Sequence, residues 1–326
     1  MDTVGSETFI AESQGTGITA VDRAQVVAAL ECATSPNTRR AYRSAWERWQ
    51  AWALKRNARV MPADPSVVAA YLTDRARQGC APATVRVDRA AISAAHRSTG
   101  AADPTASAVV HEVMRSIAKA GRDRGRGQVQ GLDWDAADRI AALAENGGRT
   151  LIGLRDGALI RVGSDALLRV SELSELDVAD LHLDDDGSGT VTVRHSKTDQ
   201  DGQGHVRYLG APTIAAMQGY LSAARVADGP LFRRLDRGGT VGGRLGAGSI
   251  RRIIAHHAKR VGIDGRVSGH SLRVGAAQSL AAEGAGLVEL QEAGDWKSPN
   301  MPSHYARNQL AARGAVARLR YGVGDK

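Results

Sequence analysis

The sequence contains only two cysteines among its 326 residues, Cys32 and Cys80, which excludes a disulfide framework and a cysteine-based metal cluster. No stretch approaches about 18 uninterrupted apolar residues, so we expect no transmembrane helix. The first 20 residues carry three acids and no apolar segment, so a signal peptide is not expected either. Aromatic residues make up only 4% of the chain, so its core must rest on alanine, valine, leucine and isoleucine. These absences favour a globular protein with no membrane partner in a reducing, cytoplasmic compartment.

The signatures of several large enzyme classes are also missing. The chain has no GxxxxGK[ST] loop, no HExxH, no paired cysteine motif and no GxSxG. A Walker-type nucleotide site, the common zinc sites and a hydrolase nucleophile elbow are therefore not expected. Three consecutive acids at 184–186 precede a predicted hairpin, and we interpret them as a solvated turn rather than a two-metal site. The sequence thus predicts an activity that uses no metal and no cofactor.

Lysine is scarce as well, although the chain is basic. The 43 basic residues outnumber the 35 acids and give a net charge of +8, yet only six of the 43 are lysine. Arginine suits planar, bidentate contacts with phosphate better than lysine does. Residues 36–130 carry 17 basic and seven acidic residues. Such a block fits either a surface that binds a polyanion, such as nucleic acid, or a solvated helical surface.

Breaking residues and apolar periodicity divide the chain into four segments. Residues 1–35 are polar and acidic, which is typical of a flexible tail. Residues 36–120 contain four amphipathic helical patterns separated by proline and glycine, which predicts a small all-α domain whose aromatic residues form its core. Residues 121–131 (GRDRGRGQVQG) are interpreted as a flexible basic linker. Residues 132–326 are predicted to form a second domain.

The second domain combines many helical patterns with one strand signal. Alternating β-branched residues at 190–195 and a further run at 205–209 flank the polar turn SKTDQDGQG, which predicts a β-hairpin. Helices are predicted over 133–145, 151–166, 212–224, 249–261, 271–283, 287–293 and 303–319. Gly314 weakens the last of these and marks a point where it can break. The predicted fold is mainly α, with an all-α N-terminal domain and an α-rich second domain that holds a small β-hairpin.

A set of charged and aromatic residues follows a fixed order in the second domain. They are Arg169 and Glu172 in LLRVSEL, Lys197 at the hairpin tip, His270 and Arg273 in GHSLRVG, and then Trp296 and Tyr305. This order resembles that of the tyrosine recombinase family, also called the phage integrase family. The Cre-type members have a stretch similar in residues and spacing to GHSLRVGAAQSLAAEGAGLVELQEAGDWKSPNMPSHYARN in this chain. The resemblance covers nearly the whole chain except about 35 residues at its start.

These residue types suit phosphodiester chemistry. The pentacoordinate transition state gathers negative charge on its non-bridging oxygens, and two guanidinium groups can neutralise that charge by bidentate contacts. Arg169 and Arg273 are the candidates for this clamp. A phenol with a pKa near 10 must lose its proton as it attacks, and His270 is the candidate base for Tyr305. His270 and Arg273 are three residues apart at the start of a predicted helix, so they project from one side of its first turn.

The resemblance implies further roles and an assembly. Lys197 is implied as the general acid for the leaving oxygen, Trp296 as an N–H donor to phosphate, and Glu172 as a residue that orients the site. The activity implied is site-specific recombination of double-stranded DNA through a 3′-phosphotyrosyl intermediate and a Holliday junction, without metal or ATP. The active form implied is a homotetramer on two duplexes, in a nucleoid-associated location.

The sequence leaves several points open. Candidates for DNA contacts are arginines on polar helix faces, namely Arg39, Arg40, Arg43, Arg86, Arg89, Arg251 and Arg252. Apolar positions after Tyr305 fit packing against either the chain's own domain or a neighbouring protomer. Two other functions use similar residues: a type IB topoisomerase that relaxes supercoils as a monomer, and a DNA-binding protein that has kept the fold without strand exchange.

Overall fold

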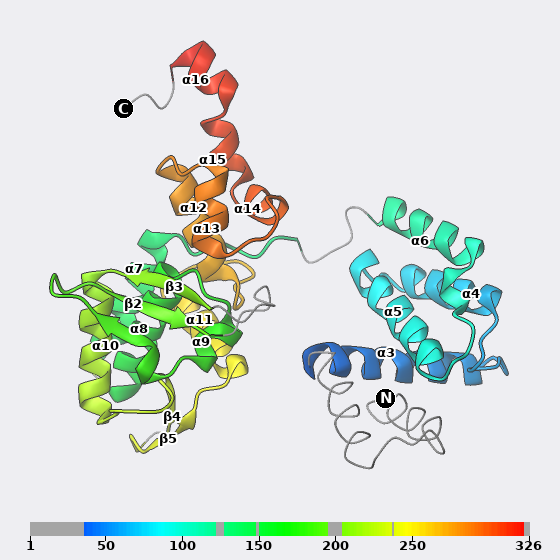
Figure 1. The fold of residues 1–326 in the computed structure, drawn as a ribbon, viewed down its shortest axis with the longest axis horizontal. Helices are drawn as coiled ribbons and strands as arrows, with labels where there is room; N and C mark the ends of the chain where they lie inside the picture. Colours follow the sequence, from blue (N-terminus) through cyan, green and yellow to red (C-terminus); the bar gives the residue numbers. More distant parts are fainter. Residues whose placement is uncertain (1–35, 122–126, 148–149, 195–203, 237, 323–326) are drawn as a thin grey trace, which may run out of the picture. The chain divides into compact units, whose positions relative to one another are not determined.

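The structure is a computed structural model that describes residues 36–121, 127–147, 150–194, 204–236 and 238–322. The chain divides into two compact units, Met1–Gly127 and Gln128–Lys326 (Figure 1). Three predicted features lie wholly or partly outside the described residues: the acidic tail 1–35, residues 122–126 of the linker predicted at 121–131, and the hairpin tip with Lys197. None of the described helices combines the length and the apolarity needed to cross a lipid bilayer.

The described part of the first unit is made of helices. It contains α3 (Pro36–Leu54), α4 (Pro65–Arg77), α5 (Pro82–Ser98), the short 3₁₀ helix η1 (Pro104–Ala106) and α6 (Ala108–Ala120). Prolines occupy the first turns of α4 and α5, where a missing N–H costs nothing. Asp64 begins α4 by accepting a hydrogen bond from the Ser66 N–H at 2.7 Å. These local signals explain why sequence patterns predict the helices well.

Most aromatic side chains of the first unit lie in or against its core, together with aliphatic residues such as Val68, Leu72 and Ile92. Trp49 and Tyr71 are buried, and their rings meet edge to face with centroids 5.2 Å apart. Trp52 approaches the same tyrosine ring at 5.3 Å. The buried carboxylate of Asp88 is neutralised by Arg48 at 2.8 Å and Arg75 at 2.9 Å. The three tryptophan and tyrosine rings therefore serve packing rather than base stacking.

The second unit is built around α8 (Leu151–Asp165), which packs against α7 (Trp134–Asn146), α10 (Ala211–Ala224) and α12 (Ser271–Ala282) (Figure 1). Its core consists mainly of alanine, valine, leucine and isoleucine, as the low aromatic content predicted. The remaining helices are α9 (Val170–Glu175), η2 (Val178–Asp180), α11 (Ala247–Arg260), α13 (Leu287–Gly294), α14 (Asn300–Tyr305), α15 (Arg307–Ala312) and α16 (Ala315–Tyr321). The mainly α fold predicted from the sequence is confirmed.

The predicted hairpin is present and belongs to a larger sheet. Strand β2 (Gly189–Val193) pairs antiparallel with β3 (His205–Leu209), with Val191 opposite Arg207. A third strand, β1 (Leu181–Leu183), pairs with the other edge of β2, and the acids at 184–186 lie in the turn between them. A separate pair joins β4 (Arg233–Leu235) to β5 (Val241–Arg244). Strands β1, β4 and β5 span only three or four residues, too few for an alternating pattern to show.

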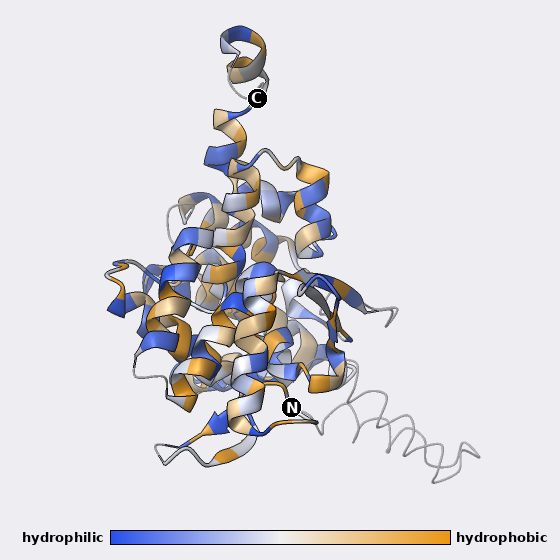
Figure 2. Ribbon diagram, turned by 90° about the vertical axis from the view of Figure 1, so that its left-hand side faces the viewer, coloured by the Kyte–Doolittle hydropathy of each residue, from blue (hydrophilic) through white to orange (hydrophobic). Residues whose placement is uncertain are grey.

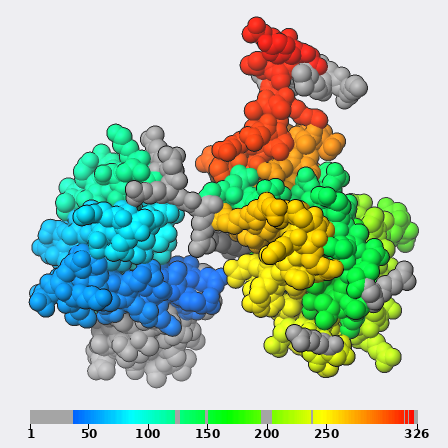
Figure 3. Space-filling model, turned by 180° about the vertical axis from the view of Figure 1, so that it is seen from behind, coloured from blue at the N-terminus to red at the C-terminus, as the bar shows by residue number. Residues whose placement is uncertain are grey.

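The predicted C-terminal helix 303–319 is divided into three short helices. Tyr305 ends α14, and a second break at Arg313 and Gly314 separates α15 from α16. Figure 2 shows that α16, at the top of the view, carries both hydrophobic and hydrophilic residues, and Figure 3 shows it extending beyond the rest of the second unit. Val316 and Leu319 on α16 are 70% and 79% exposed. Val316 and Leu319 therefore pack little against the part of the chain that the structure describes.

Residues 128–131, which the sequence placed at the end of the linker, are bound to the second unit. The Gln130 N–H donates to the Arg266 carbonyl at 3.1 Å, and the Leu132 N–H donates to the Ser271 carbonyl at 2.9 Å. The segment crosses α12 so closely that a Cβ on Gly275 would lie 1.8 Å from the Leu132 carbonyl oxygen. Only glycine at position 275 permits this approach.

We expect Gly275→Ala to destabilise the second unit. The added methyl group must push the Leu132 main chain away from α12, and overpacking of this kind costs about 1–3 kcal/mol. Thermal unfolding of the purified chain measures the loss. Gly219→Ala in α10 is the matched control, because a Cβ there meets nothing within 4 Å and alanine favours a helix. Equal unfolding temperatures for both variants would contradict the expectation.

Candidate active site

Arg169 is held at the beginning of α9 by Glu172. The Arg169 main-chain N–H donates to the Glu172 carboxylate at 2.8 Å, and the Arg169 guanidinium pairs with the other oxygen of the same carboxylate. Glu172 is almost fully buried, whereas Arg169 keeps part of its side chain exposed. A carboxylate that is buried and fixed by two bonds holds the arginine in one orientation.

Arg273 lies on the first turn of α12 and is buried. Its guanidinium donates to the Leu167 carbonyl at 2.5 Å and to the Gly294 carbonyl, and it stacks on the Trp296 ring with Cζ 4.3 Å from the centroid. Burial, reinforced by repulsion from Arg169, lowers the pKa of Arg273 to about 10, so the group stays cationic at neutral pH. The guanidinium groups of Arg169 and Arg273 are thus held close together, and their combined positive charge favours binding of an anion.

His270 immediately precedes α12. Its main-chain N–H donates to the Ser268 hydroxyl at 3.2 Å, and the Ser271 hydroxyl accepts from the Ser268 N–H at 2.9 Å, which fixes the turn. The residue keeps an exposed surface, yet desolvation by the surrounding protein and repulsion from Arg273 and Arg169 lower its pKa below 6.5. The neutral imidazole, which can accept a proton, is therefore the main form at pH 7.

Trp296 and Tyr305 complete the cluster. Their ring centroids are 5.9 Å apart, and the Trp296 ring covers Gly294 so closely that a Cβ on that glycine would lie 2.0 Å from it. Burial raises the pKa of the Tyr305 phenol above 10, while Arg273 and Arg169 act in the opposite direction. The phenol is therefore protonated at rest and lies within the electrostatic reach of both guanidinium groups.

The structure thus brings together six of the seven predicted catalytic and orienting residues, from α9, α12 and the segment around α13 and α14. They are Arg169, Glu172, His270, Arg273, Trp296 and Tyr305. Lys197 lies outside the described residues. The last residue of β2, Val193, and the first of β3, His205, line the same small cavity as Glu172 and Arg273. The open end of the hairpin therefore borders the cluster.

Comparison with known proteins decides the family. Residues 131–311, more than half of the chain, match the model of the "Phage integrase family", and residues 8–98 match "Phage integrase, N-terminal SAM-like domain". The chain belongs to the phage integrase family. It is a tyrosine-type site-specific recombinase, and the family prediction from the order of residues is confirmed.

Relatives of this recombinase cover most of its length. It is 29% identical to recombinase Cre of Escherichia phage P1 over 83% of this chain and 84% of the relative. It is also 29% identical to an integrase/recombinase XerD homolog of Selenomonas ruminantium, over 85% and 83% of the two chains. The fold is similar to that of a XerH recombinase solved with a palindromic difH substrate, with a TM-score of 0.68, 14% identity and coverage of 98% and 95%.

The recombinase has site residues that the sequence analysis did not identify. Arg207 on β3 donates to the Glu292 carbonyl at 2.8 Å, and burial lowers its pKa. His205 lies 3.2 Å from Asp295, a residue whose φ of 50° is left-handed and which directly precedes Trp296. The alternation of β3 places 205, 207 and 209 on one face, which is the only sequence signal for these positions.

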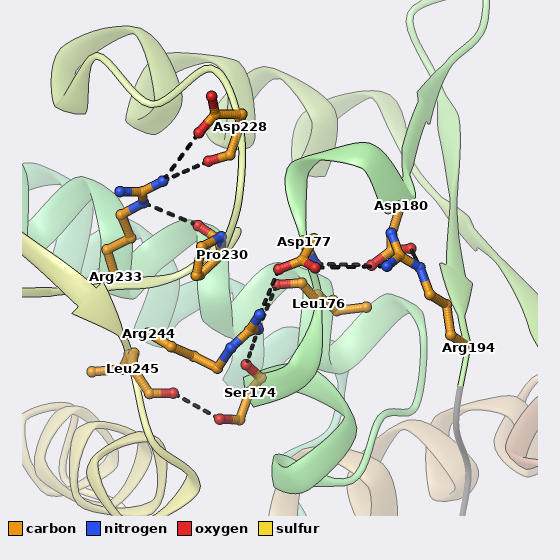
Figure 4. A network of polar contacts seen from close by, with 10 residues as sticks. All are labelled: Ser174, Leu176, Asp177, Asp180, Arg194, Asp228, Pro230, Arg233, Arg244 and Leu245. Atoms are coloured by element: carbon orange, nitrogen blue, oxygen red, sulfur yellow. Dashed lines mark hydrogen bonds and ion pairs between the residues drawn. The ribbon is translucent and has the colours of Figure 1, made fainter.

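A second polar network supports the end of β2 in the recombinase (Figure 4). Arg194 directly follows β2 and donates to Asp180 at 2.5 Å, and Asp180 in turn accepts from the Asp177 N–H at 2.8 Å. Arg244 on β5 pairs with Asp177 at 2.6 Å and donates to the Ser174 carbonyl at 2.8 Å. The network links β2 and β5 to the segment after α9, so it fixes the strand that leads toward Lys197.

The arginines predicted to contact DNA lie on three helices of the recombinase. Those on α3 are Arg39, Arg40 and Arg43, those on α5 are Arg86 and Arg89, and those on α11 are Arg251 and Arg252. Five of them are exposed, whereas Arg39 and Arg89 are half-buried. Arg89 donates to the Thr105 carbonyl at 3.4 Å, with the His111 ring at 3.3 Å. Arg89 is therefore tied to its own unit, while the exposed members are accessible to a ligand.

Proposed function

We propose that this recombinase cleaves double-stranded DNA by attack of the Tyr305 phenolic oxygen on the scissile phosphate. The new bond is a 3′-phosphotyrosyl ester, the bond to the 5′ oxygen breaks, and a 5′-hydroxyl is released. The observation that carries the proposal is that Tyr305 and Arg273 lie against the same ring: the Tyr305 and Trp296 centroids are 5.9 Å apart, and the Arg273 Cζ lies 4.3 Å from the Trp296 centroid. Arg273 and Arg169 both act electrostatically on the phenol. A nucleophile next to two fixed cations fits attack on an anionic ester.

The two arginines supply the charge stabilisation in this proposal. Arg273 directs two of its five N–H groups at the Leu167 and Gly294 carbonyls, which leaves the others able to bind non-bridging phosphate oxygens. Trp296 donates its indole N–H to the same phosphate. Because the phosphotyrosyl ester keeps the energy of the broken phosphodiester, rejoining to a 5′-hydroxyl needs no ATP, and the arginines make the same charge compensation that a metal ion makes elsewhere.

Proton transfer completes the chemistry. His270 takes the phenolic proton as the bond to phosphorus forms, and Lys197 gives a proton to the departing 5′ oxygen. The lowered pKa of His270 supports the first role, since the neutral ring is the acceptor. The role of Lys197 rests on its place in the motif order. Attack by a 5′-hydroxyl from a second duplex reverses each step and exchanges strands through a Holliday junction.

The proposed active form is a homotetramer on two duplexes that carry a specific recombination site, associated with the nucleoid. Exposed apolar side chains on α16 support a C-terminal helix that docks on a neighbouring protomer. The exposed arginines of α3, α5 and α11 would contact phosphates, and such contacts position the protein without reading sequence. Two proteins of similar fold were solved with DNA: XerH with difH, and a lambda integrase dimer with a COC' core site. The lambda integrase match has a TM-score of 0.55 and 18% identity, and it covers 87% of this chain and 75% of that one.

A nicked suicide duplex tests the proposal. Cleavage next to the nick frees a short fragment, so the phosphotyrosyl product is trapped and migrates as a protein–DNA adduct. Sequencing the DNA attached to trapped protein gives both the site and the cleavage position. Relaxation of a plasmid without any recognition site would favour a type IB topoisomerase instead. Tight binding with no adduct would favour a DNA-binding protein without strand exchange.

We expect the cleavage rate to rise with pH and then to level off. His270 has a lowered pKa, so it is protonated and unable to act as a base only below about pH 6.5. Above that value it is neutral, and because the pKa of Tyr305 is raised, little phenolate forms to add a second rise before about pH 9. Single-turnover cleavage of the nicked duplex as a function of pH measures the profile.

His270→Gln serves as the control for this profile. It removes the base but keeps a polar side chain of similar size, so the acid limb is expected to disappear together with most of the rate. A wild-type rate that keeps climbing about tenfold per pH unit from pH 7 to pH 9 would assign the proton transfer to a group other than His270.

A further inference from the structure

Two glutamine side chains converge on the main-chain carbonyl oxygen of Tyr305. The amide of Gln128 donates to it at 3.3 Å, and the amide of Gln278 donates to it at 3.2 Å. Gln128 is the first residue of the second unit, and Gln278 lies on α12, the helix that also carries Arg273. We propose that Gln128 and Gln278 are positioning residues for the nucleophile, and that Gln128 couples the segment joining the two units to it. The inference rests on the function proposed for Tyr305.

The position of Tyr305 explains why such bonds matter. Tyr305 is the last residue of α14, a helix of only six residues, and carbonyl groups at the end of a helix have no partner within it. A single short turn has almost no stability of its own, so its orientation depends on tertiary contacts. Two amide donors can satisfy both lone pairs of one carbonyl oxygen. The backbone that carries the phenol is therefore fixed from two sides.

Gln278 is held in place by the segment that contains Gln128. A Cβ on Gly131 would lie 2.1 Å from the Gln278 side-chain oxygen and 3.2 Å from the Gly275 Cα. Residues 128–131 therefore cover the side chain of Gln278 as well as supplying the second donor. Any change that lifts this segment from α12 removes one bond to Tyr305 directly and loosens the other.

The same segment supplies a matched control. Gln130 is two residues from Gln128 and has the same side chain, but its amide donates to the Gly131 carbonyl at 3.2 Å. Its main-chain N–H, which binds the Arg266 carbonyl, is unchanged by substitution of the side chain. Gln130→Ala thus alters an exposed glutamine of this segment without touching the carbonyl of Tyr305.

The experiment compares Gln128→Ala, Gln278→Ala and the double variant with Gln130→Ala and the wild type, all in the full-length chain. Single-turnover cleavage of the nicked duplex gives the maximal rate, and the dependence on protein concentration separates DNA binding from cleavage. We expect each single variant to cleave roughly 10-fold more slowly and the double variant roughly 100-fold more slowly, with binding unchanged. Thermal unfolding checks that every variant is folded.

A duplex with sulfur in place of the 5′ bridging oxygen identifies the step that is affected. A thiolate leaves without being protonated, so this substrate bypasses the general acid but still needs a correctly placed phenol. The defects of Gln128→Ala and Gln278→Ala are expected to persist on it. Complete recovery on the sulfur substrate would overturn the proposal, because the defect would then lie in protonation of the leaving group.

Further outcomes separate this inference from the function on which it rests. Wild-type protein that forms no adduct would refute the proposed nucleophile. Wild-type protein that forms the adduct while both glutamine variants match its maximal rate would refute the positioning role alone. A loss confined to DNA affinity would also refute it, since a bond to the Tyr305 backbone acts on the rate of cleavage and not on binding.

Discussion

Tyr305→Phe is expected to abolish the covalent adduct while DNA binding remains unchanged. The substitution removes a single oxygen atom, so the ring still packs against Trp296 and the fold is preserved. Without that oxygen no phosphotyrosyl ester can form, and loss of a catalytic nucleophile costs at least about 10⁴-fold in rate. Denaturing electrophoresis of the nicked-duplex reaction detects the adduct, and a binding assay on the intact duplex confirms that the variant still engages DNA.

A mixing experiment extends this prediction. Because Tyr305 and Arg273 of one chain lie against the same Trp296 ring, a protomer is expected to supply both its nucleophile and its arginine pocket. A mixture of Tyr305→Phe with an Arg273 variant should therefore remain unable to cleave. Recovery of cleavage in the mixture would mean that the tyrosine of one protomer acts in the pocket of another, contrary to the arrangement in this structure.

The second large effect is expected for Arg273→Lys. Lysine keeps the charge, but a single ammonium group cannot donate to the Leu167 and Gly294 carbonyls, stack on Trp296 and bind phosphate at the same time. Loss of one fixed donor to the transition state typically costs about 10²–10³ in rate. Single-turnover cleavage at saturating protein is expected to fall by this factor.

A neutral substrate checks the physical reason for this loss. If Arg273 compensates negative charge, a methylphosphonate at the scissile position, which lacks one anionic oxygen, should reduce the penalty of Arg273→Lys. An unchanged penalty on that substrate would point to a packing role for the arginine. Thermal unfolding is measured alongside, because Arg273 is buried and also bonds two carbonyl groups of its own chain.

The sequence was sufficient for the features that local patterns determine. The order of the charged and aromatic residues, through its resemblance to a known family, named six residues that lie together in the structure: Arg169, Glu172, His270, Arg273, Trp296 and Tyr305. Their catalytic roles stay predictions. The long helices followed from apolar periodicity and capping residues such as Asp64. The β2–β3 hairpin followed from two alternating runs around a polar turn.

Features that arise from tertiary contacts could not be predicted in this way. Nothing near Gln128 in the sequence indicates that its amide reaches a carbonyl 177 residues further along the chain. Asp295 has a left-handed backbone conformation, but the sequence does not signal it because the residue is not a glycine. The C-terminal helix was predicted as one element with a weak point at Gly314, and the structure has a break there, at Arg313 and Gly314. The additional break at Ala306, a buried residue packed in the same apolar cluster as Trp296, has no signal in the local sequence.

The raised pKa of Tyr305 bears on how a DNA-breaking enzyme remains harmless between reactions. A tyrosine held as phenolate would be reactive whenever any phosphodiester came near. In this chain burial disfavours the phenolate, so in the mechanism proposed above Tyr305 reacts only when a proton acceptor takes its proton as it attacks. On that mechanism, cleavage of a target depends on this proton transfer as well as on DNA binding.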